Sequence, residues 1–337
     1  MNGLTDRFRR TIDYMRISVT DRCNLRCIYC MPPEGLSPMA HGEILRYEEI
    51  VRVLRVAAGI GVRKIRVTGG EPLVRKNIPH LIQLIRDIDG IRDLSLTTNG
   101  ALLEKYAAEL AAAGLDRVNV SLDSLKSERY REITRGGDID AVFRGIEAAG
   151  EAGLVPVKIN MVPIRGLNDD EITDFARMTL HSPHQVRFIE FMPIGRQDLW
   201  KPERFIPVEE IRSIVERTGR LNPVKLRKSG PARYFKFDGA AGVIGFISPL
   251  SNHFCGECNR LRLTADGKLR PCLFSETEID LKPALRSDAP DNEIERLIRL
   301  SIEVKPEGHN IRLQDVYLKR LMESKRVCGR PMSKIGG

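Results

Sequence analysis

Apolar positions in the first two thirds of the chain follow two alternating periods, which predicts repeated strand–helix units. Short runs rich in β-branched residues are separated by longer segments in which apolar residues recur every three to four positions, as in amphipathic helices. The expected strands are 15–20, 64–68, 94–98, 117–122, 155–162 and 186–192. The expected helices are 47–59, 78–88, 102–113, 141–150 and 169–180. The last helix has a capping-box-like start at Asn168 and Glu171. Six such units predict an α/β protein with a partial (β/α)6 TIM-like barrel.

Residues within each expected strand alternate between apolar and polar, although a parallel sheet covered on both faces would be apolar throughout. In 64–68 we expect Ile65 and Val67 to face the helices, and Lys64 and Arg66 to face the barrel interior. Over all strands the inward set is Arg16, Lys64, Arg66, Ser95, Thr97, Asn119, Ser121, Lys158 and Asn160. Burying several unpaired cations is very unfavourable, so the interior must hold water, counter-charges or a ligand, and an anion-binding cavity is the simplest prediction.

Two features of this strand pattern leave alternatives open. An antiparallel sheet with one face in solvent would also alternate, although connections of helix length favour parallel strands. In the last expected strand Arg187 and Met192 have opposite parity. A bulge or shift near its end is therefore needed if both residues point inward.

After about residue 223 the helical alternation stops and short strands with turns follow. Strands are expected at 234–237, 242–247 and 261–269, where Asp266 and Gly267 form a hairpin turn, and 279–325 is expected to be mostly helical. We therefore expect two domains, a barrel over 1–222 and a C-terminal α+β lobe over 223–337 that carries a second cysteine group.

Six of the seven cysteines form two tight groups. The first, Cys23, Cys27 and Cys30, has the spacing C-x3-C-x2-C after the first expected strand; the second is Cys255, Cys258 and Cys272. Structural zinc and an ordinary [4Fe-4S] cluster take four ligands, so a cluster held by three cysteines keeps one iron open. A partial zinc site or buried free cysteines are the alternatives for the first group, and a zinc site completed by His253 for the second. Cys328 is left over and is expected to be structural.

Composition and charge limit the classes of binding partner and the cellular location that we expect. The 337 residues carry a net charge of +9, but basic and acidic residues are interleaved and there is no basic tail, which favours a compact polyanionic substrate over nucleic acid. No apolar run approaches the length of a membrane span and the N-terminus lacks a secretory signal. Grouped cysteines are typical of metal ligation in a reducing compartment. We expect a cytoplasmic protein without membrane contact.

The motifs together resemble a known family. C-x3-C-x2-C with Tyr29 before the last cysteine resembles the signature of radical S-adenosylmethionine (SAM) enzymes. The sequence TGGEP at 68–72 resembles the turn that holds the amino group of SAM in these enzymes. The carboxylate and nearby carbonyls of such a turn can accept hydrogen bonds from an ammonium group. Further matches are TTNG (97–100), NVSLDS (119–124), VKIN (157–160), FMPIG (191–195), CxxCNRLRLT (255–264) and the terminal Gly336 and Gly337. With these the sequence resembles the GTP 3′,8-cyclase family, radical SAM enzymes of the first step of molybdenum cofactor biosynthesis.

The resemblance implies two [4Fe-4S] clusters and SAM as cofactors, together with their ligands. Cys23, Cys27 and Cys30 would hold the SAM cluster, and Cys255, Cys258 and Cys272 the auxiliary cluster, whose open iron meets the substrate. SAM would contact Tyr29, Gly70, Ser121 and Met192. GTP would contact Arg16, Lys64, Arg66, Thr97, Lys158, Arg187, Arg260, Leu261 and Arg262. Arg16, Gly336 and Gly337 would take part in catalysis.

The implied reaction is the conversion of GTP to (8S)-3′,8-cyclo-7,8-dihydroguanosine 5′-triphosphate, begun when a 5′-deoxyadenosyl radical removes the hydrogen at ribose C3′. Implied partners are a reductant such as flavodoxin or ferredoxin, the next pathway enzyme cyclic pyranopterin monophosphate synthase, and a second copy of the chain in a homodimer. Two alternatives remain at this point, a radical SAM peptide or protein maturase with an auxiliary cluster and a zinc-containing nucleic-acid-binding module.

Overall fold

The computed structural model describes residues 3–194, 199–226, 230–309, 311 and 330. Strands in this part of the chain are β1 Tyr14–Ser18, β2 Lys64–Thr68, β3 Asp93–Thr98, β4 Arg117–Ser121, β5 Lys158–Met161, β6 Gln185–Ile189, β7 Leu221–Val224, β8 Arg233–Phe237, β9 Val243–Ile247, β10 Arg260–Leu263, β11 Lys268–Arg270 and β12 Ile279–Asp280. Helices are α1 Tyr47–Gly59, α2 Ile78–Arg86, α3 Leu103–Ala112, α4 Ser127–Thr134, α5 Ile139–Glu151, α6 Ile172–His181, α7 Val208–Glu216, α8 Lys282–Arg286 and α9 Asp291–Glu303. Short 3-10 turns are η1 His41–Glu43, η2 Pro72–Val74, η3 Asp169–Glu171, η4 Pro202–Arg204 and η5 Cys255–Glu257.

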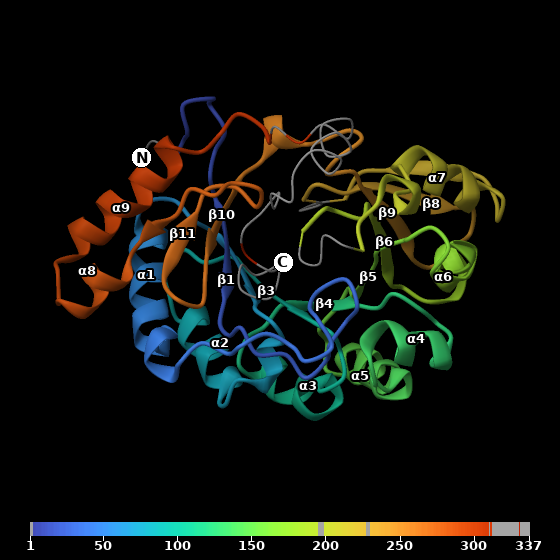
Figure 1. Ribbon diagram of the computed structural model, residues 1–337, viewed down its shortest axis with the longest axis horizontal. Helices are drawn as coiled ribbons and strands as arrows, with labels where there is room; N and C mark the ends of the chain where they lie inside the picture. The colour runs from blue at the N-terminus through green and yellow to red at the C-terminus, as the bar shows by residue number, and fades with distance from the viewer. Residues whose placement is uncertain (1–2, 195–198, 227–229, 310, 312–329, 331–337) are drawn as a thin grey trace.

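Strands β1 to β6 lie next to one another in chain order and are all parallel. Figure 1 shows them as part of an open arc with the helices on its outer side. The prediction of a partial barrel is therefore confirmed, and the antiparallel alternative is wrong for these strands. None of the described helices combines the length and the apolar character that crossing a membrane requires.

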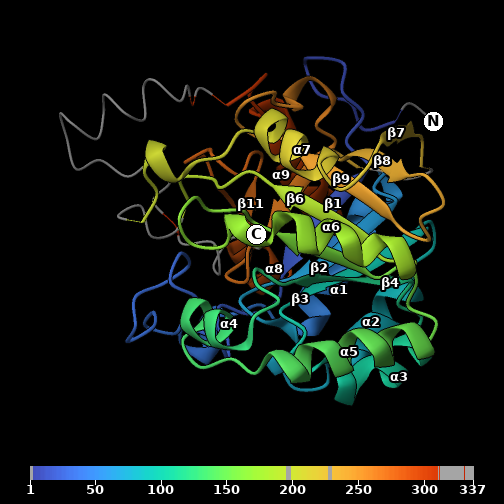
Figure 2. The same ribbon diagram turned by 90° about the vertical axis from the view of Figure 1, so that its right-hand side faces the viewer.

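In β2 the apolar side chains face the helices and the polar ones face the interior, as predicted. Ile65 and Val67 of β2 are fully buried in the main core, whereas Lys64 and Arg66 between them line the interior. On the outer side, α1 presents Ile50, Leu54 and the residues one turn further to this core, because apolar residues recur at helical spacing. Figure 2 shows the outer layer from the side, with α3 and α5 packed next to each other.

The residues after 220 extend this same sheet at both edges. β10 pairs with β1 and β9 pairs with β6, both in parallel, and the sheet order is β12-β11-β10-β1-β2-β3-β4-β5-β6-β9-β8-β7. The outer strands on each side are antiparallel. The predicted hairpin is present, since β10 and β11 are antiparallel and Gly267 in their turn has a φ of +85°. Whether residues 1–222 and 223–337 act as separate domains stays a prediction.

Three local predictions differ from the structure. β5 begins at Lys158 rather than at 155, since Pro156 has no N–H to donate to a ladder. β6 ends at Ile189, so Met192 reaches the cavity from the loop beyond it and no bulge is needed. Asn168 and Glu171 form no capping box: the Asn168 amide bonds the backbone of 123, 162 and 164, and the Glu171 carboxylate accepts from Ser124 and the backbone N–H of 125.

Part of the expected C-terminal helical region is also different. Residues 279–280 form β12, and α8 and α9 follow it. The rest of that region, 312–325, lies outside the described residues, as do Cys328, Gly336 and Gly337.

Candidate active site

A cavity of about 410 Å³ lies inside the arc and is lined by both cysteine groups and by the inward faces of β1 to β6. The predicted residues that line it are Arg16, Cys23, Cys27, Tyr29, Cys30, Lys64, Arg66, Gly70, Thr97, Ser121, Lys158, Arg187, Met192, Cys255, Cys258, Arg260, Arg262 and Cys272. Leu261 does not line it, because its side chain points to the opposite face of β10 and is fully buried in the main core. Asn119 also faces inward without lining the cavity; its side-chain oxygen accepts a hydrogen bond from Arg187 Nη2 at 2.7 Å.

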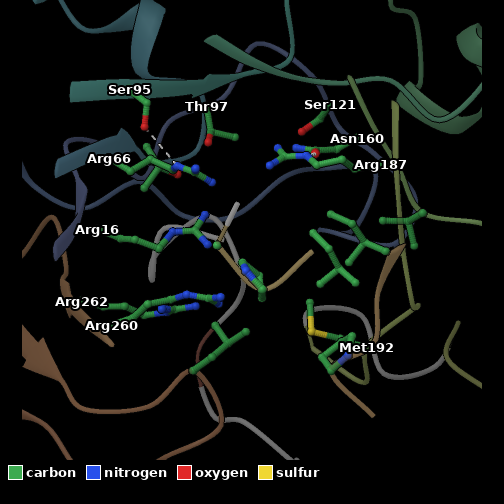
Figure 3. A pocket seen from close by; sticks show the side chains of 18 of the residues that line it. Arg16, Arg66, Ser95, Thr97, Ser121, Asn160, Arg187, Met192, Arg260 and Arg262 are labelled. Atoms are coloured by element: carbon green, nitrogen blue, oxygen red, sulfur yellow. Dashed lines mark hydrogen bonds between the residues drawn. The ribbon is translucent and has the colours of Figure 1, made fainter. Parts of the chain in front are cut away.

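Three arginines form a row across one wall of the cavity. Arg262 on β10, Arg16 on β1 and Arg66 on β2 are register partners on neighbouring strands, which lie roughly 4.8 Å apart. Figure 3 shows their side chains, with Arg260 beside them, extending in the same direction, and Met192 on the other side of the cavity. The Nε atoms of Arg16 and Arg262 are buried and have no hydrogen-bond partner among the described residues. Like charges placed directly opposite repel, so this row is suited to an anion.

The cations of the cavity have few counter-charges. Lys64 Nζ is 2.7 Å from Asp13 Oδ2, and Arg117 Nη2 is 2.6 Å from Asp93 Oδ1. Within the described part of the chain, the others form no ion pair with an acidic side chain; these are Arg16, Arg66, Lys158, Arg187, Arg260 and Arg262. Burial, together with repulsion from Arg187 and Arg117, lowers the pKa of Lys158 to about 6. The interior is therefore a region of excess positive charge.

Neutral groups hold the remaining guanidinium groups in place. Arg187 Nε donates to Asn160 Oδ1 at 2.8 Å, and Arg66 Nε donates to Ser95 Oγ at 3.3 Å while its guanidinium lies 5.6 Å from the centre of the Tyr14 ring. These contacts orient the cations without neutralising them. A bound anion would supply the missing charge.

The first cysteine group lies on the loop after β1 and is fixed by the neighbouring strand ends. Tyr29 Oη donates to the Asp123 carboxylate, which also accepts from the N–H of Val162 at 2.8 Å, so the loop is tied to the ends of β4 and β5. Burial raises the pKa of Asp123 to about 6. Burial, with Cys23 and Asp123 adding to it, raises the pKa of Cys30 to about 12.

The turn after β2 packs directly against this cysteine loop. A Cβ at Gly70 would lie 2.3 Å from the carbonyl oxygen of Arg22, so the glycine is required by the approach of two backbones. The Glu71 carboxylate is fully buried and accepts from Thr98 Oγ1, from the N–H of Asn99 and from the N–H of Leu73. Three of its acceptor positions are thus used within the protein, and the interpretation that this turn receives an ammonium group stays a prediction. The carboxylate joins the turn after β2 to the turn after β3, and burial raises its pKa to about 7.

The second cysteine group is brought together by η5 and the strand pair β10 and β11. Cys255 begins η5, Cys258 follows it, and Cys272 lies after β11. Burial alone would raise the pKa of the Cys258 thiol, but the positive charges of Lys305 and Arg260 outweigh it and the pKa is lowered. This thiol favours the charged form that a metal ligand needs.

The two cysteine groups lie toward opposite ends of the parallel strands. The first follows the carboxyl end of β1, whereas Cys258 precedes the amino end of β10, which runs parallel to β1. The arginine row of Arg16, Arg66 and Arg262 lies on the strands between them. The cavity is therefore lined by one cysteine group toward each end of the parallel strands.

The donor sets fit two clusters with three cysteine ligands each. All six cysteines are free, partly buried and at the cavity. No three His, Cys, Asp or Glu side chains in the described part of the chain are placed to hold one metal ion, and the His253 ring packs edge-on against His309 at 5.2 Å. Structural zinc takes four ligands, whereas a [4Fe-4S] cluster held by three cysteines keeps one iron open, so donor sets of three cysteines suit clusters better than zinc.

Sequence reasoning missed several cavity residues. Tyr14, Asp93 and Arg117 line the cavity, each two positions before an inward residue that was predicted. Extending the strand parity by one step toward the amino end would have found them. Asp123 and His309 lie on loops, where no periodicity indicates a direction.

Comparisons with known proteins agree with this geometry. Residues 17–179 match the Radical SAM superfamily, and residues 184–311 match the family Molybdenum Cofactor Synthesis C. The fold is similar to Streptococcus suis SuiB bound to S-adenosylmethionine, with a TM-score of 0.56 and 15% identity over 96% of this chain and 75% of that one. It is also similar to methylornithine synthase PylB, with a TM-score of 0.51 and 16% identity over 88% of this chain and 86% of that one.

Full-length relatives are much closer in sequence. The chain is 53% identical to the GTP 3′,8-cyclase of Thermodesulfovibrio yellowstonii and 52% identical to that of Heliobacterium modesticaldum, each over 99% of this chain and 100% of the relative. Radical SAM enzymes use SAM and a [4Fe-4S] cluster, and the GTP 3′,8-cyclase family carries a second cluster. The chain belongs to the GTP 3′,8-cyclase family of the radical SAM superfamily.

Proposed function

We propose that this chain converts GTP to 3′,8-cyclo-7,8-dihydro-GTP, the first step of molybdenum cofactor synthesis. The observation that carries the proposal is the row of Arg262, Arg16 and Arg66 between two three-cysteine groups in one cavity. A triphosphate supplies the negative charge that this wall lacks, and planar guanidinium groups bind phosphate oxygens in pairs.

Cys23, Cys27 and Cys30 would hold the cluster that binds SAM, and Cys255, Cys258 and Cys272 the auxiliary cluster. When bound, SAM and its cluster would supply the 5′-deoxyadenosyl radical that the removal of the hydrogen at ribose C3′ requires. Tyr29, Gly70, Ser121 and Met192 line the cavity on the side of the first group and are the proposed SAM contacts.

The protein's own contribution is orientation and exclusion of water. Arg16, Arg66 and Arg262 would hold the phosphates. Thr97 and the remaining inward cations, Lys64, Lys158, Arg187 and Arg260, would fix the nucleotide along the strands. Holding the ribose carbon near the radical makes a bimolecular reaction effectively unimolecular, which is a large source of rate enhancement. Arg16, at the centre of the row, is the proposed catalytic arginine.

The test is to incubate the anaerobically reconstituted, reduced protein with SAM and either GTP or ATP, and to quantify 5′-deoxyadenosine and nucleotide products by mass spectrometry. Deoxyadenosine matched by a cyclised product from GTP alone supports the cyclase. SAM cleavage with no altered nucleotide would instead favour a peptide or protein maturase. Zinc without iron, and no cleavage, would favour the nucleic-acid-binding module.

Several finer assignments belong to the same proposal. Gly336 and Gly337 lie outside the described residues, and their catalytic role stays a prediction: deleting Gly337 should abolish cyclisation and leave SAM binding intact. A reductant such as flavodoxin or ferredoxin, product transfer to cyclic pyranopterin monophosphate synthase and a homodimer follow from the family alone. The free cysteines support a reducing compartment such as the cytoplasm.

A further inference from the structure

Lys305 places a buried ammonium group against the second cysteine group. The residue follows α9 and only 2% of its surface is exposed. Its Nζ donates to the carbonyl oxygens of Arg260 at 2.8 Å and Pro271 at 2.6 Å, and lies 3.6 Å from Cys258 Sγ. An ammonium group has three N–H donors, so all three are directed at this site. The two carbonyls belong to the segments that carry Cys258 and Cys272.

The charge of Lys305 has no carboxylate partner in the described part of the chain. Burying an ammonium group without a counter-charge is strongly unfavourable. The sulfur of Cys258 is the one group among its hydrogen-bond partners that can carry a negative charge. A thiolate that ligates iron would provide that charge.

The buried ion pair of Arg10 and Asp6 fixes the backbone that follows Lys305. Arg10 Nη1 donates to the carbonyl oxygens of Cys255 at 2.8 Å and Glu307 at 2.7 Å, and its Nη2 donates to that of Pro306 at 2.7 Å. Arg10 Nε is itself 2.6 Å from Asp6 Oδ2, and both side chains are buried. One guanidinium thus joins the cysteine loop to the two residues after Lys305, so the ammonium group cannot easily move away.

Among the described residues no cation donates a hydrogen bond to a sulfur of the first cysteine group; Arg26 lies in that loop, but its Nη1 donates to the carbonyl oxygen of Cys23 at 2.6 Å. Cys23 Sγ accepts from the N–H of Leu25 at 3.4 Å and from Asn99 Nδ2 at 3.9 Å, and both donors are neutral. Hydrogen bonds and net charge near the sulfurs set the reduction potential of an iron–sulfur cluster. A nearby positive charge stabilises the reduced state, which carries one more electron.

We propose that Lys305 is a positioning residue of the auxiliary cluster, which holds the Cys258 and Cys272 segments together and raises the cluster's reduction potential through its charge at the Cys258 sulfur. The inference rests on the proposed auxiliary cluster. It assigns the two clusters different electrostatic environments within one cavity. The auxiliary cluster would accept an electron more readily than it would without Lys305.

The test compares Lys305→Gln, which keeps a hydrogen-bond donor without the charge, with Lys305→Arg, which keeps the charge. Lys105→Gln, at an exposed lysine on α3, is the matched control. Full-length protein is reconstituted, its iron is counted, and a redox titration is followed by electron paramagnetic resonance. The auxiliary signal is identified as the one that remains in a Cys27→Ala protein. We expect Lys305→Gln to shift this potential to more negative values, Lys305→Arg to restore most of the shift, and Lys105→Gln to match the unaltered chain.

Each other outcome has a defined meaning. Loss of iron from the second group in Lys305→Gln but not in Lys305→Arg would also support the charge role. An unchanged potential in Lys305→Gln with full iron content would overturn the inference and leave the proposed function standing. Equal loss of iron in both variants would overturn the charge role in favour of packing alone. Absence of iron from the second group in the unaltered chain would overturn the inference together with the proposed function.

Discussion

Because Lys158 is buried among cations, we expect the protein to take up a proton when GTP binds. The pKa of Lys158 is lowered to about 6 by burial and by the nearby Arg187, Arg117 and Arg66, so at pH 8 only about one molecule in 100 has a charged Lys158. A triphosphate beside the amine favours the charged form and raises the pKa in the complex. Above pH 6 the free protein must therefore gain a proton as the nucleotide binds, whereas below pH 6 the amine is already charged.

The size of the effect follows from this linkage. Between about pH 6 and the pKa of Lys158 in the complex, the affinity for GTP should fall by about tenfold for each pH unit, or about 1.4 kcal/mol. GTP's own terminal phosphate ionises near pH 6, so measurements between about pH 7.5 and 9 avoid its contribution. The lowered pKa of Arg187, about 10, lies above this range.

Isothermal titration calorimetry in buffers of different ionisation enthalpy, with oxidised clusters and no SAM, measures the number of protons taken up without turnover. We expect close to one proton for the unaltered chain and for Lys105→Met, and close to zero for Lys158→Met. The advantage of the unaltered chain over Lys158→Met in GTP affinity should also shrink as the pH rises. The same proton number in Lys158→Met, or none in the unaltered chain, would refute the reasoning.

Three further predictions concern the cavity wall and the two turns beside the first cysteine group. Arg66→Ala should weaken GTP binding by about 1.5 to 3 kcal/mol in a binding titration, because a charged hydrogen bond to phosphate is lost, and should weaken guanosine binding much less. Equal losses for GTP and guanosine would contradict this prediction. So would a similar loss of GTP affinity in the control Arg177→Ala, at an exposed arginine. Glu71→Gln should lower the free energy of unfolding of the cluster-free protein by about 1 to 3 kcal/mol, because glutamine has one acceptor oxygen where the carboxylate has two. An unchanged midpoint of urea unfolding would count against this prediction. Gly70→Ala should reduce the iron bound at the first cysteine group, because its Cβ would collide with the carbonyl of Arg22, and full iron content by chemical assay would show that the loop can move.

The strands and their inward faces could be predicted from the sequence because alternation with period 2 is a local property. The interior positions of Arg16 and Arg66 followed from that parity alone. For Arg262 the two-residue spacing predicts a face shared with Arg260 that could bind a phosphate, but its place in the row depends on β10 pairing with β1 far along the chain. No local pattern contains that information.

Side-chain roles that depend on distant backbone were the least predictable. Glu71 lies in a motif that suggests a ligand contact, and the motif gives no sign that its carboxylate also accepts from Thr98 and Asn99 at the end of β3. The capping-box pattern at Asn168 failed for the same reason, since both side chains find partners on other loops. Lys305 carries no motif or periodicity, and only the three-dimensional contacts of its ammonium group distinguish it.

The addition of late strands to both edges of the barrel has a consequence for biosynthesis. β1 leaves the ribosome early, but its partner β10 begins only at Arg260, so one edge of β1 waits for the synthesis of most of the chain. At about 5 to 20 residues per second this delay is roughly 10 to 50 s. During that time the nascent barrel presents the open edge of β1, and such edges pair readily with other chains. Efficient production of this protein therefore depends on protecting the unfinished sheet, and chaperone supply or slower, cooler expression should raise the yield of folded chain.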